Sequence, residues 1–156
     1  MAEKEKTGVL QKDGHSDQEL QQILELRKVA VVGISRDPTK PSHYFAKYLK
    51  EHGYSIIPVN PFCEEVLGLR CYKSLLDVEE SVDIVDVFRP PHEVPAVIDE
   101  ALKKRPKIVW LQEGIHHSES ERKALLNGIE VVWNRCMMKE HVRLHGGKPR
   151  VSLSSL

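Results

Sequence analysis

The sequence predicts an α/β protein with a five-stranded parallel sheet covered by helices on both faces. Five short runs rich in β-branched residues recur along the chain, and amphipathic stretches of helical periodicity separate them. Strands that are buried on both faces have continuous apolar sequences of this kind. The pattern therefore favours a doubly wound, Rossmann-like sheet with the strand order 3-2-1-4-5, while a flavodoxin-like order with the same periodicity stays open.

The predicted elements follow one another in regular alternation. A helix over 16–28, with Ser16 or Asp17 as its N-cap, precedes the first strand. The predicted strands cover 29–34, 54–60, 82–88, 107–114 and 129–134. The predicted helices cover 42–53, 92–105, 118–128 and 136–146, with Ser42 and Ser118 as N-caps. We expect an irregular stretch over 62–81 with a short helix near 73–78.

Length and composition fit one soluble domain. The chain has 156 residues, which suffices to bury roughly 70% of the unfolded surface. We expect a flexible leader over residues 1–14, a single domain over 15–146 and a flexible tail over 147–156. A net charge of zero provides no overall field to attract nucleic acid. No apolar run approaches the ~20 residues that span a bilayer, and MAEKEKTG lacks the apolar core of a signal peptide.

The three cysteines are too few and too scattered for a disulfide framework or a zinc knuckle. Such sparse usage is typical of a reducing compartment, so we expect a cytoplasmic protein. No metal site is predicted, because His141 and His145 lie four residues apart without an evident third ligand.

The turn after the first strand is the first candidate for ligand binding. In VAVVGISRDPTKPSHYF, Gly33 allows close approach of the backbone to a ligand, but Ser35 and Pro38 replace the further glycines of a dinucleotide-binding motif. Ser35 offers a hydroxyl, and Arg36 and Lys40 add positive charge near a helix N-terminus. This turn is suited to a phosphate group, although a plain turn with solvated side chains is the alternative.

The ends of the second and third strands extend the candidate site. Val59 and Asn60 end the second strand, where an NAD site usually has an acidic residue, so ordinary NAD binding is disfavoured. Asn60 is suited to hydrogen bonding with a base or sugar, or simply closes a turn before proline. After the third strand, Phe88 and Pro90 are suited to form an apolar wall and Arg89 to pair with a phosphate.

An ordered series of motifs carries a family resemblance. The stretches are VAVVGIS, YSIIPVNP, EVLG, CYKSL, VDIVDVFRPP, VWLQEGI and NRCMMKEH. Over about residues 20–145 the chain resembles the small stand-alone CoA-binding proteins of bacteria and archaea, which are similar to the N-terminal CoA-binding domain of the succinyl-CoA synthetase alpha subunit. The resemblance implies that CoA or an acyl-CoA lies across the carboxyl edge of the sheet. It also implies that Leu111, Gln112 and Glu113 match a segment that touches CoA.

Two departures from the synthetase pattern stand out. The first turn has fewer glycines, and Phe62 and Cys63 stand where the synthetase has a lysine that meets the ligand. We hypothesise that Lys40 or Arg36 supplies the missing charge.

The resemblance leaves catalysis open. The synthetase subunit has a second domain with a phosphorylated histidine and works with an ATP-grasp partner, and neither fits in this chain. We therefore expect a non-catalytic CoA-binding module or detached subunit, compatible with a protein partner or a homo-oligomer. One alternative is an NAD(P)- or CoA-disulfide-dependent redox enzyme, in which Arg135 and a helix N-terminus lower the pKa of Cys136. Against it, the sequence favours a buried, inert thiol at Cys136, because free cysteines are usually buried. Another alternative is a nucleotide-regulated interaction protein.

Overall fold

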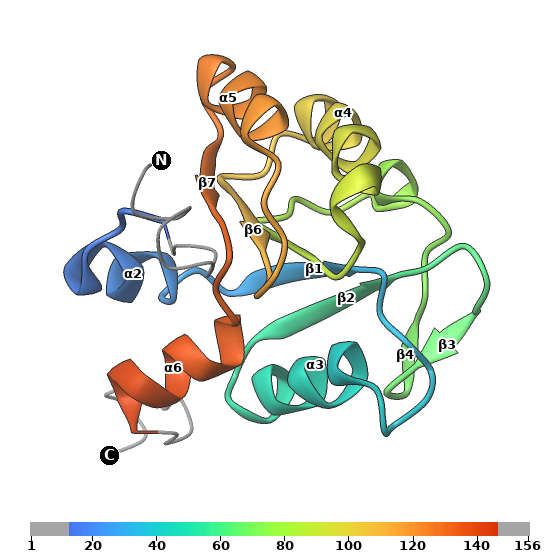
Figure 1. The fold of residues 1–156 in the computed structure, drawn as a ribbon. Helices are drawn as coiled ribbons and strands as arrows, with labels where there is room; N and C mark the ends of the chain where they lie inside the picture. The colour runs from blue at the N-terminus through green and yellow to red at the C-terminus, as the bar shows by residue number, and fades with distance from the viewer. Residues whose placement is uncertain (1–12, 147–156) are drawn as a thin grey trace.

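A five-stranded parallel sheet with helices on both faces organises residues 13–146, the part of the chain that the computed structural model describes (Figure 1). Its strands are β1 (Lys28–Val32), β2 (Ser55–Val59), β5 (Ile84–Val87), β6 (Ile108–Leu111) and β7 (Glu130–Val132). The helices are α2 (Asp17–Ile23), α3 (Pro41–Glu51), α4 (Val94–Lys104), α5 (Ser118–Leu126) and α6 (Met137–His145). The predicted α/β class and the alternation of strands and helices are confirmed.

The order of the strands places β1 and β5 side by side near the middle of the sheet. The full order is β2-β1-β5-β6-β7, which is 2-1-3-4-5 when these five strands are counted alone. Tyr72 adds an isolated parallel bridge to Val59 of β2. When this segment is counted as the third strand, the order becomes 3-2-1-4-5-6, and its first five positions match the predicted 3-2-1-4-5. In either count the direction of winding reverses between β1 and β5, where a doubly wound sheet leaves a crevice for a ligand.

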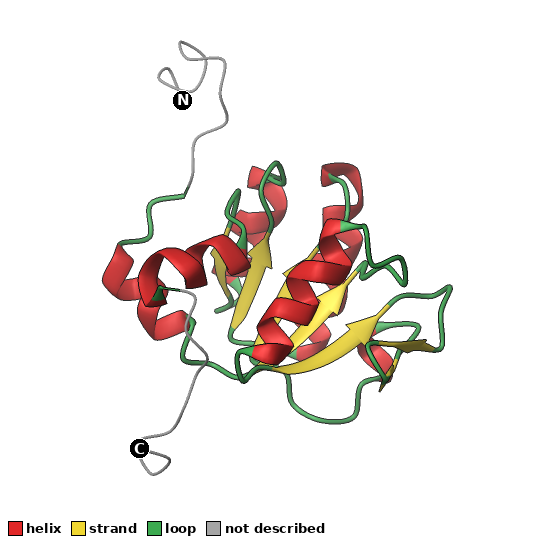
Figure 2. Cartoon of the chain, turned by 90° about the horizontal axis from the view of Figure 1, so that it is seen from below, coloured by secondary structure: helices red, strands yellow, loops and turns green. Residues whose placement is uncertain are grey.

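The helices form two layers because successive strand residues point to opposite faces of the sheet. Val29 and Val31 of β1 face α2, α3 and α6, whereas Ala30 and Val32 face α4, α5 and the short 3₁₀ helix η1 (Leu75–Asp77). The cartoon in Figure 2 shows the same layers from a second direction. Within the described residues, no helix is long and apolar enough to cross a membrane.

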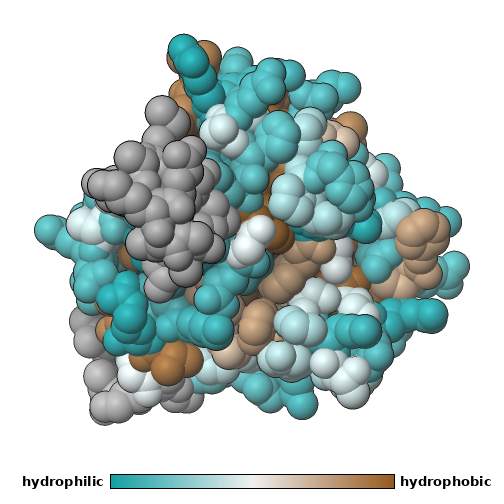
Figure 3. Space-filling view, viewed as in Figure 1, coloured by the Kyte–Doolittle hydropathy of each residue, from teal (hydrophilic) through white to brown (hydrophobic). Residues whose placement is uncertain are grey.

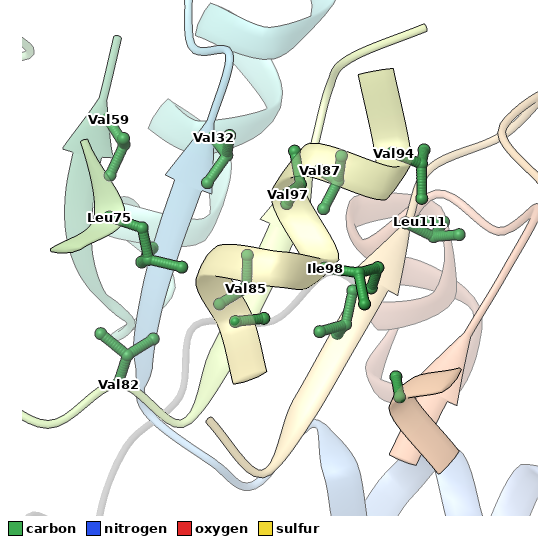
Figure 4. Packing of buried hydrophobic residues seen from close by; sticks show 14 of the residues in the cluster. Val32, Val59, Leu75, Val82, Val85, Val87, Val94, Val97, Ile98 and Leu111 are labelled. Carbon is green, nitrogen blue, oxygen red and sulfur yellow. The ribbon is translucent and has the colours of Figure 1, made fainter. Parts of the chain in front are cut away.

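Hydrophobic side chains pack between α4 and the face of the sheet that it covers. Val85 and Val87 of β5 pack with Val97 and Ile98 of α4, and the cluster continues to Leu111 of β6 (Figure 4). Each such side chain stabilises the fold by about 1.5–3 kcal/mol when it is fully buried. This packing fixes where β5 and β6 end, and those ends carry the candidate ligand residues.

Two predicted helix caps are wrong. The N-cap of α3 is Lys40 and that of α5 is His117, rather than Ser42 and Ser118. Proline at the first position presets the helical φ and starts α3 one residue before Ser42. The buried Ser42 hydroxyl instead accepts a hydrogen bond from the backbone N–H of Ser35 at 2.9 Å. In α5, a ring nitrogen of His117 accepts a backbone N–H of the first turn and so performs the capping.

A small antiparallel hairpin occupies part of the stretch expected to be irregular. It pairs β3 (Glu65–Val66) with β4 (Leu69–Arg70). Its turn has positive φ at both central residues, 55° at Leu67 and 71° at Gly68. This is the pattern of tight hairpin turns, in which glycine is common and leucine is rare. The expected short helix farther along is present as η1.

One residue of the expected leader is buried against the last part of the described chain. Asp13, inside the expected leader of residues 1–14, is buried, and its Oδ1 lies 2.7 Å from Nε of Arg135. Asp13 therefore belongs to the domain, because a buried carboxylate needs a partner of this kind. The rest of the expected leader, residues 1–12, and the expected tail, 147–156, lie outside the described residues.

Candidate functional site

Two adjoining cavities open at the carboxyl edge of the sheet, beside the first turn of α3. The larger, of about 660 Å³, is lined by Ser35, Lys40, Pro41, Ser42, Phe45, Phe88, Arg89, Pro90, Gln112, Glu113 and Ile115. The smaller, of about 550 Å³, is lined by Gly33, Ile34, Ser35, Arg36, Asp37, Asn60, Phe62 and Cys63. Ser35 belongs to both, so the two cavities meet at the turn after β1. A band of hydrophobic surface crosses the middle of the face in Figure 3, with polar surface on either side.

Ten of the twelve residues predicted to bind a ligand line these cavities. The exceptions are Val59 and Leu111, whose side chains lie in the hydrophobic cluster on the α4 face. Their strands end at the site, but alternation along each strand turns these two side chains into the core. Phe45 is a lining residue that sequence reasoning missed, although its place in the first half of a helix that follows the turn was a usable signal.

Gly33 is required at the first turn because two segments approach each other closely there. Its φ is +91°, and a Cβ at this position would lie 2.6 Å from the backbone oxygen of Phe88. The Gly33 N–H donates to the carbonyl of Val59 at 2.9 Å, which joins the turn to the end of β2. The glycine predicted to allow close approach to a ligand thus also allows the turn to pack against the β5 end.

Hydrogen bonds hold the rest of this turn against α3. Ser35 donates its backbone N–H to Ser42, and its carbonyl lies 2.8 Å from Nδ1 of His43. The Ser35 hydroxyl accepts the backbone N–H of Asp37 at 3.0 Å and keeps its own proton for a ligand. The turn is therefore organised before any ligand arrives, which lowers the entropic cost of binding.

Positive charge is available at this turn. Within residues 13–146, neither Arg36 nor Lys40 takes part in a salt bridge with another described residue, and both line a cavity. Arg89 forms one long ion pair, in which its Nη1 lies 3.8 Å from a carboxylate oxygen of Glu93. Lys40 also stands at the N-terminus of an eleven-residue helix, where the helix dipole favours an anion. These groups suit a phosphate ester.

Asn60 has a structural role in the loop after β2. Its Nδ2 donates to the carbonyl of Ile34 at 2.6 Å, and its Oδ1 accepts the backbone N–H of Phe62 at 2.8 Å. The side chain thereby joins the first turn to the loop that closes the smaller cavity. Of the two interpretations of Asn60, the turn-closing one matches these contacts, and Oδ1 keeps a second lone pair that can accept a hydrogen bond.

A buried carboxyl group stands behind Gln112. Asp86, in the middle of β5, is 1% exposed, and its Oδ1 accepts a hydrogen bond from Nε2 of Gln112. Burial raises the pKa of Asp86 to about 7, although this hydrogen bond opposes the rise. The Oε1 of Gln112 is buried and has no hydrogen-bond partner among the described residues. Other atoms of Gln112 line the larger cavity, so this acceptor lies close to it.

Cys136 lacks the environment of a reactive thiol. It is 2% exposed, and burial raises its pKa to about 11 despite backbone hydrogen bonds that lower it. The lowered pKa that the redox alternative requires is therefore wrong, and burial matches the favoured interpretation of Cys136 as a buried thiol. Arg135, the expected cation beside it, is directed instead to Asp13. Within the described residues, no three side chains are placed to hold a metal ion together.

The fold and the two cavities define a Rossmann-like α/β domain with a candidate ligand site at the carboxyl edge of its sheet. More narrowly, the chain belongs to the CoA binding domain family, which matches residues 27–142. The resemblance predicted from the sequence motifs is thereby confirmed.

Known relatives fall into two groups. The chain is 35% identical over 127 residues to the uncharacterized protein YneT of Bacillus subtilis, covering 81% of this chain and 94% of YneT. It is 31% identical over 139 residues to an ADP-forming acetate–CoA ligase of Methanocaldococcus jannaschii, covering 83% of this chain and 20% of the ligase. A solved structure of a hypothetical protein from Pyrococcus horikoshii OT3 has a TM-score of 0.83 and 42% identity, covering 85% of this chain and 94% of that one. The chain therefore spans about a fifth of the ligase.

Proposed function

We propose that the protein binds CoA or an acyl-CoA across the carboxyl edge of its sheet, as a binding module without chemistry of its own. The observation that carries the proposal is the pair of adjoining cavities that meet at Ser35, a larger one with mainly apolar surface and a smaller, more polar one. CoA has a phosphorylated nucleotide at one end and a less polar pantetheine arm at the other. Membership of the CoA binding domain family supports the same ligand.

The nucleotide end of CoA suits the smaller, polar cavity, and the pantetheine arm suits the larger, apolar one. Arg36 and Lys40 would pair with phosphate oxygens near the start of α3. Phe45 and Phe88 would contact the arm, and the free Oε1 of Gln112 would accept one of its amide N–H groups. The orphaned acceptor thus gains a partner that CoA possesses.

Native mass spectrometry and calorimetric titration with CoA, acetyl-CoA, pantetheine, ADP and NAD test this proposal. We expect CoA to bind most tightly and pantetheine and ADP to bind more weakly, because each of these fills one cavity. NAD should not bind, since Asn60 stands where an NAD site has an acidic residue. Binding of NAD without binding of CoA would overturn the proposal.

Lys40→Ala tests the phosphate-binding part of the site. Loss of a charge-assisted hydrogen bond costs about 1.5–3 kcal/mol, so CoA affinity should fall by about tenfold to a hundredfold. Affinity for pantetheine, which lacks the diphosphate, should fall much less, although Lys40 also lines the larger cavity. Lys47→Ala is the matched control, because Lys47 is exposed on the same helix and lines neither cavity. Equal CoA affinity in the two variants would remove Lys40 from the site.

A further inference from the structure

Two cysteine sulfurs lie side by side next to the smaller cavity. The Sγ atoms of Cys63 and Cys71 are 3.2 Å apart, and both side chains are buried. Cys63 follows β2 and Cys71 follows β4, so the hairpin between them folds the chain back and brings the sulfurs together. The backbone N–H of Cys71 donates to the carbonyl of Glu64 at 2.8 Å, which extends the hairpin ladder to this pair.

The distance between the two sulfurs is only slightly longer than a disulfide bond. A disulfide has its sulfurs about 2.05 Å apart, so bond formation needs an approach of about 1 Å. Cys63 and Cys71 sit in a connecting loop rather than inside a long strand or helix, and such segments adjust by this amount more easily. Cys136, at the start of α6, is the third cysteine of the sequence and lies outside this pair.

The pair is coupled to the candidate ligand site through Asn60. The Cys71 thiol lies 3.7 Å from the backbone oxygen of Asn60, and Cys63 lines the smaller cavity. Asn60 in turn donates to the carbonyl of Ile34 in the first turn. A change of bonding at the two sulfurs therefore takes place at the lining of the smaller cavity.

The two thiols differ in how a reagent can reach them. Cys63 borders the cavity, whereas Cys71 lines neither of the two cavities at the sheet edge. Burial, followed by the hydrogen bond with Cys63, raises the pKa of Cys71 to about 12, so Cys71 remains a protonated thiol. A reagent that enters the cavity would therefore meet Cys63 first, with Cys71 in position for a second step.

We propose that Cys63 and Cys71 form a reversible dithiol–disulfide pair that low-molecular-weight disulfides oxidise through the smaller cavity. The Cys63 thiol loses its proton to solvent, and the resulting thiolate attacks one sulfur of the reagent. The other half of the reagent leaves as a thiolate and takes up a proton. Cys71 then attacks the Cys63 sulfur and breaks its bond to the reagent sulfur, and the departing thiolate takes up the Cys71 proton and leaves as the second reagent thiol. The protein loses two protons and two electrons, and one reagent disulfide becomes two thiols.

Oxidised glutathione and mass spectrometry test the pair in the full-length protein. We expect the intact protein to lose two hydrogen atoms and a proteolytic digest to contain the 63–71 cross-link, both reversed by dithiothreitol. In Cys71→Ala the reaction should stop at a mixed disulfide with glutathione on Cys63. Cys136→Ala, the matched control, should react as wild type does. If the wild-type protein forms no cross-link while the urea-unfolded protein does, the proposal is overturned.

A second arm connects the pair to the ligand and rests on the proposed function. CoA at saturation should slow oxidation, because its nucleotide end would cover Cys63 in the smaller cavity. Oxidation that is unchanged by CoA, in protein that binds CoA in a parallel titration, would keep the dithiol pair and overturn the placement of the nucleotide. Absence of CoA binding in that titration would overturn the proposed function and leave the cross-link result standing.

Discussion

Gly33→Ala is the perturbation that most directly tests how the first turn is built. The φ of +91° lies in a region that L-residues rarely adopt, and an added Cβ would lie 2.6 Å from the Phe88 oxygen and 3.3 Å from Cδ of Arg89. The Phe88 oxygen belongs to the backbone at the end of β5, so it cannot rotate away as a flexible side chain could. Both the conformational strain and the clash therefore oppose the substitution.

The two effects have separable magnitudes. A strained φ costs about 1–3 kcal/mol, and forcing atoms into a filled space typically costs about 1–3 kcal/mol more. Gly68→Ala is the matched control, because Gly68 has a φ of +71° and no atom lies within 4 Å of the position that its Cβ would take. We expect a loss of about 1–2 kcal/mol in Gly68→Ala and of about 3 kcal/mol or more in Gly33→Ala.

Urea unfolding measures both variants, with the slope of the transition used to check that the unfolded states are comparable. Calorimetric titration with CoA supplies the second readout. Relief of the clash would move Phe88 and Arg89, which line the larger cavity, so Gly33→Ala should also bind CoA about tenfold more weakly or worse. Equal stability losses in the two variants would refute the close approach of the turn to the β5 end.

Three further predictions concern buried charges. Asp13→Asn removes the closer of two buried carboxylates beside Arg135 and leaves only Glu140, at 3.6 Å, so it should lower the free energy of unfolding by about 3 kcal/mol. Asp99→Asn, in an exposed pair, should change it by less than about 1 kcal/mol, and equal effects of the two substitutions in urea unfolding would contradict this. The hydrogen bond with Asp13 is the main cause that raises the pKa of His15 from 6.5 to about 9. The contribution of protonated His15 to the free energy of unfolding is therefore complete below pH 6.5 and is lost as the pH rises to about 9. His15→Gln should abolish that loss in unfolding curves measured across this pH range, and a persisting loss would exclude His15 as its source. Because burial raises the pKa of Asp86 from 3.8 to about 7, the folded state retains a proton that the unfolded chain releases, and stability falls as the pH rises through this interval. Asp86→Asn should therefore gain stability relative to wild type by up to about 4 kcal/mol between these pH values, and a constant difference would argue against a protonated Asp86.

The layered fold follows from sequence features that act locally. Apolar runs such as VAVVGI and VDIVDVF predict buried strands because a parallel sheet covered on both faces tolerates few polar side chains. The carboxyl ends of those strands then predict where a ligand binds, and Gly33, Arg36 and Gln112 all line the resulting cavities. The fold prediction succeeds because each element depends on a single segment and a general rule of sheet topology, whereas ligand binding at this edge stays a prediction.

Other features depend on contacts between distant segments or on unusual backbone geometry. The hairpin that brings Cys63 to Cys71 turns at Leu67, a residue with no preference for positive φ, so the sequence carries no signal for it. Asp86 is visible in the sequence as the polar residue within an apolar strand, yet only the neighbouring strand supplies its partner Gln112. Pattern analysis along the chain does not reveal such pairings.

The contact between Asp13 and Arg135 has a consequence for the order of folding. It joins positions that are separated by 122 residues, and Arg135 lies shortly after β7, the last strand of the sheet along the chain. Closing so long a loop is entropically unfavourable until the intervening segments have folded. We therefore expect this contact to form after the rate-limiting step, so that its loss accelerates unfolding more than it slows folding. The beginning of the domain would thus set how long the folded state persists, and have little influence on how quickly it is reached.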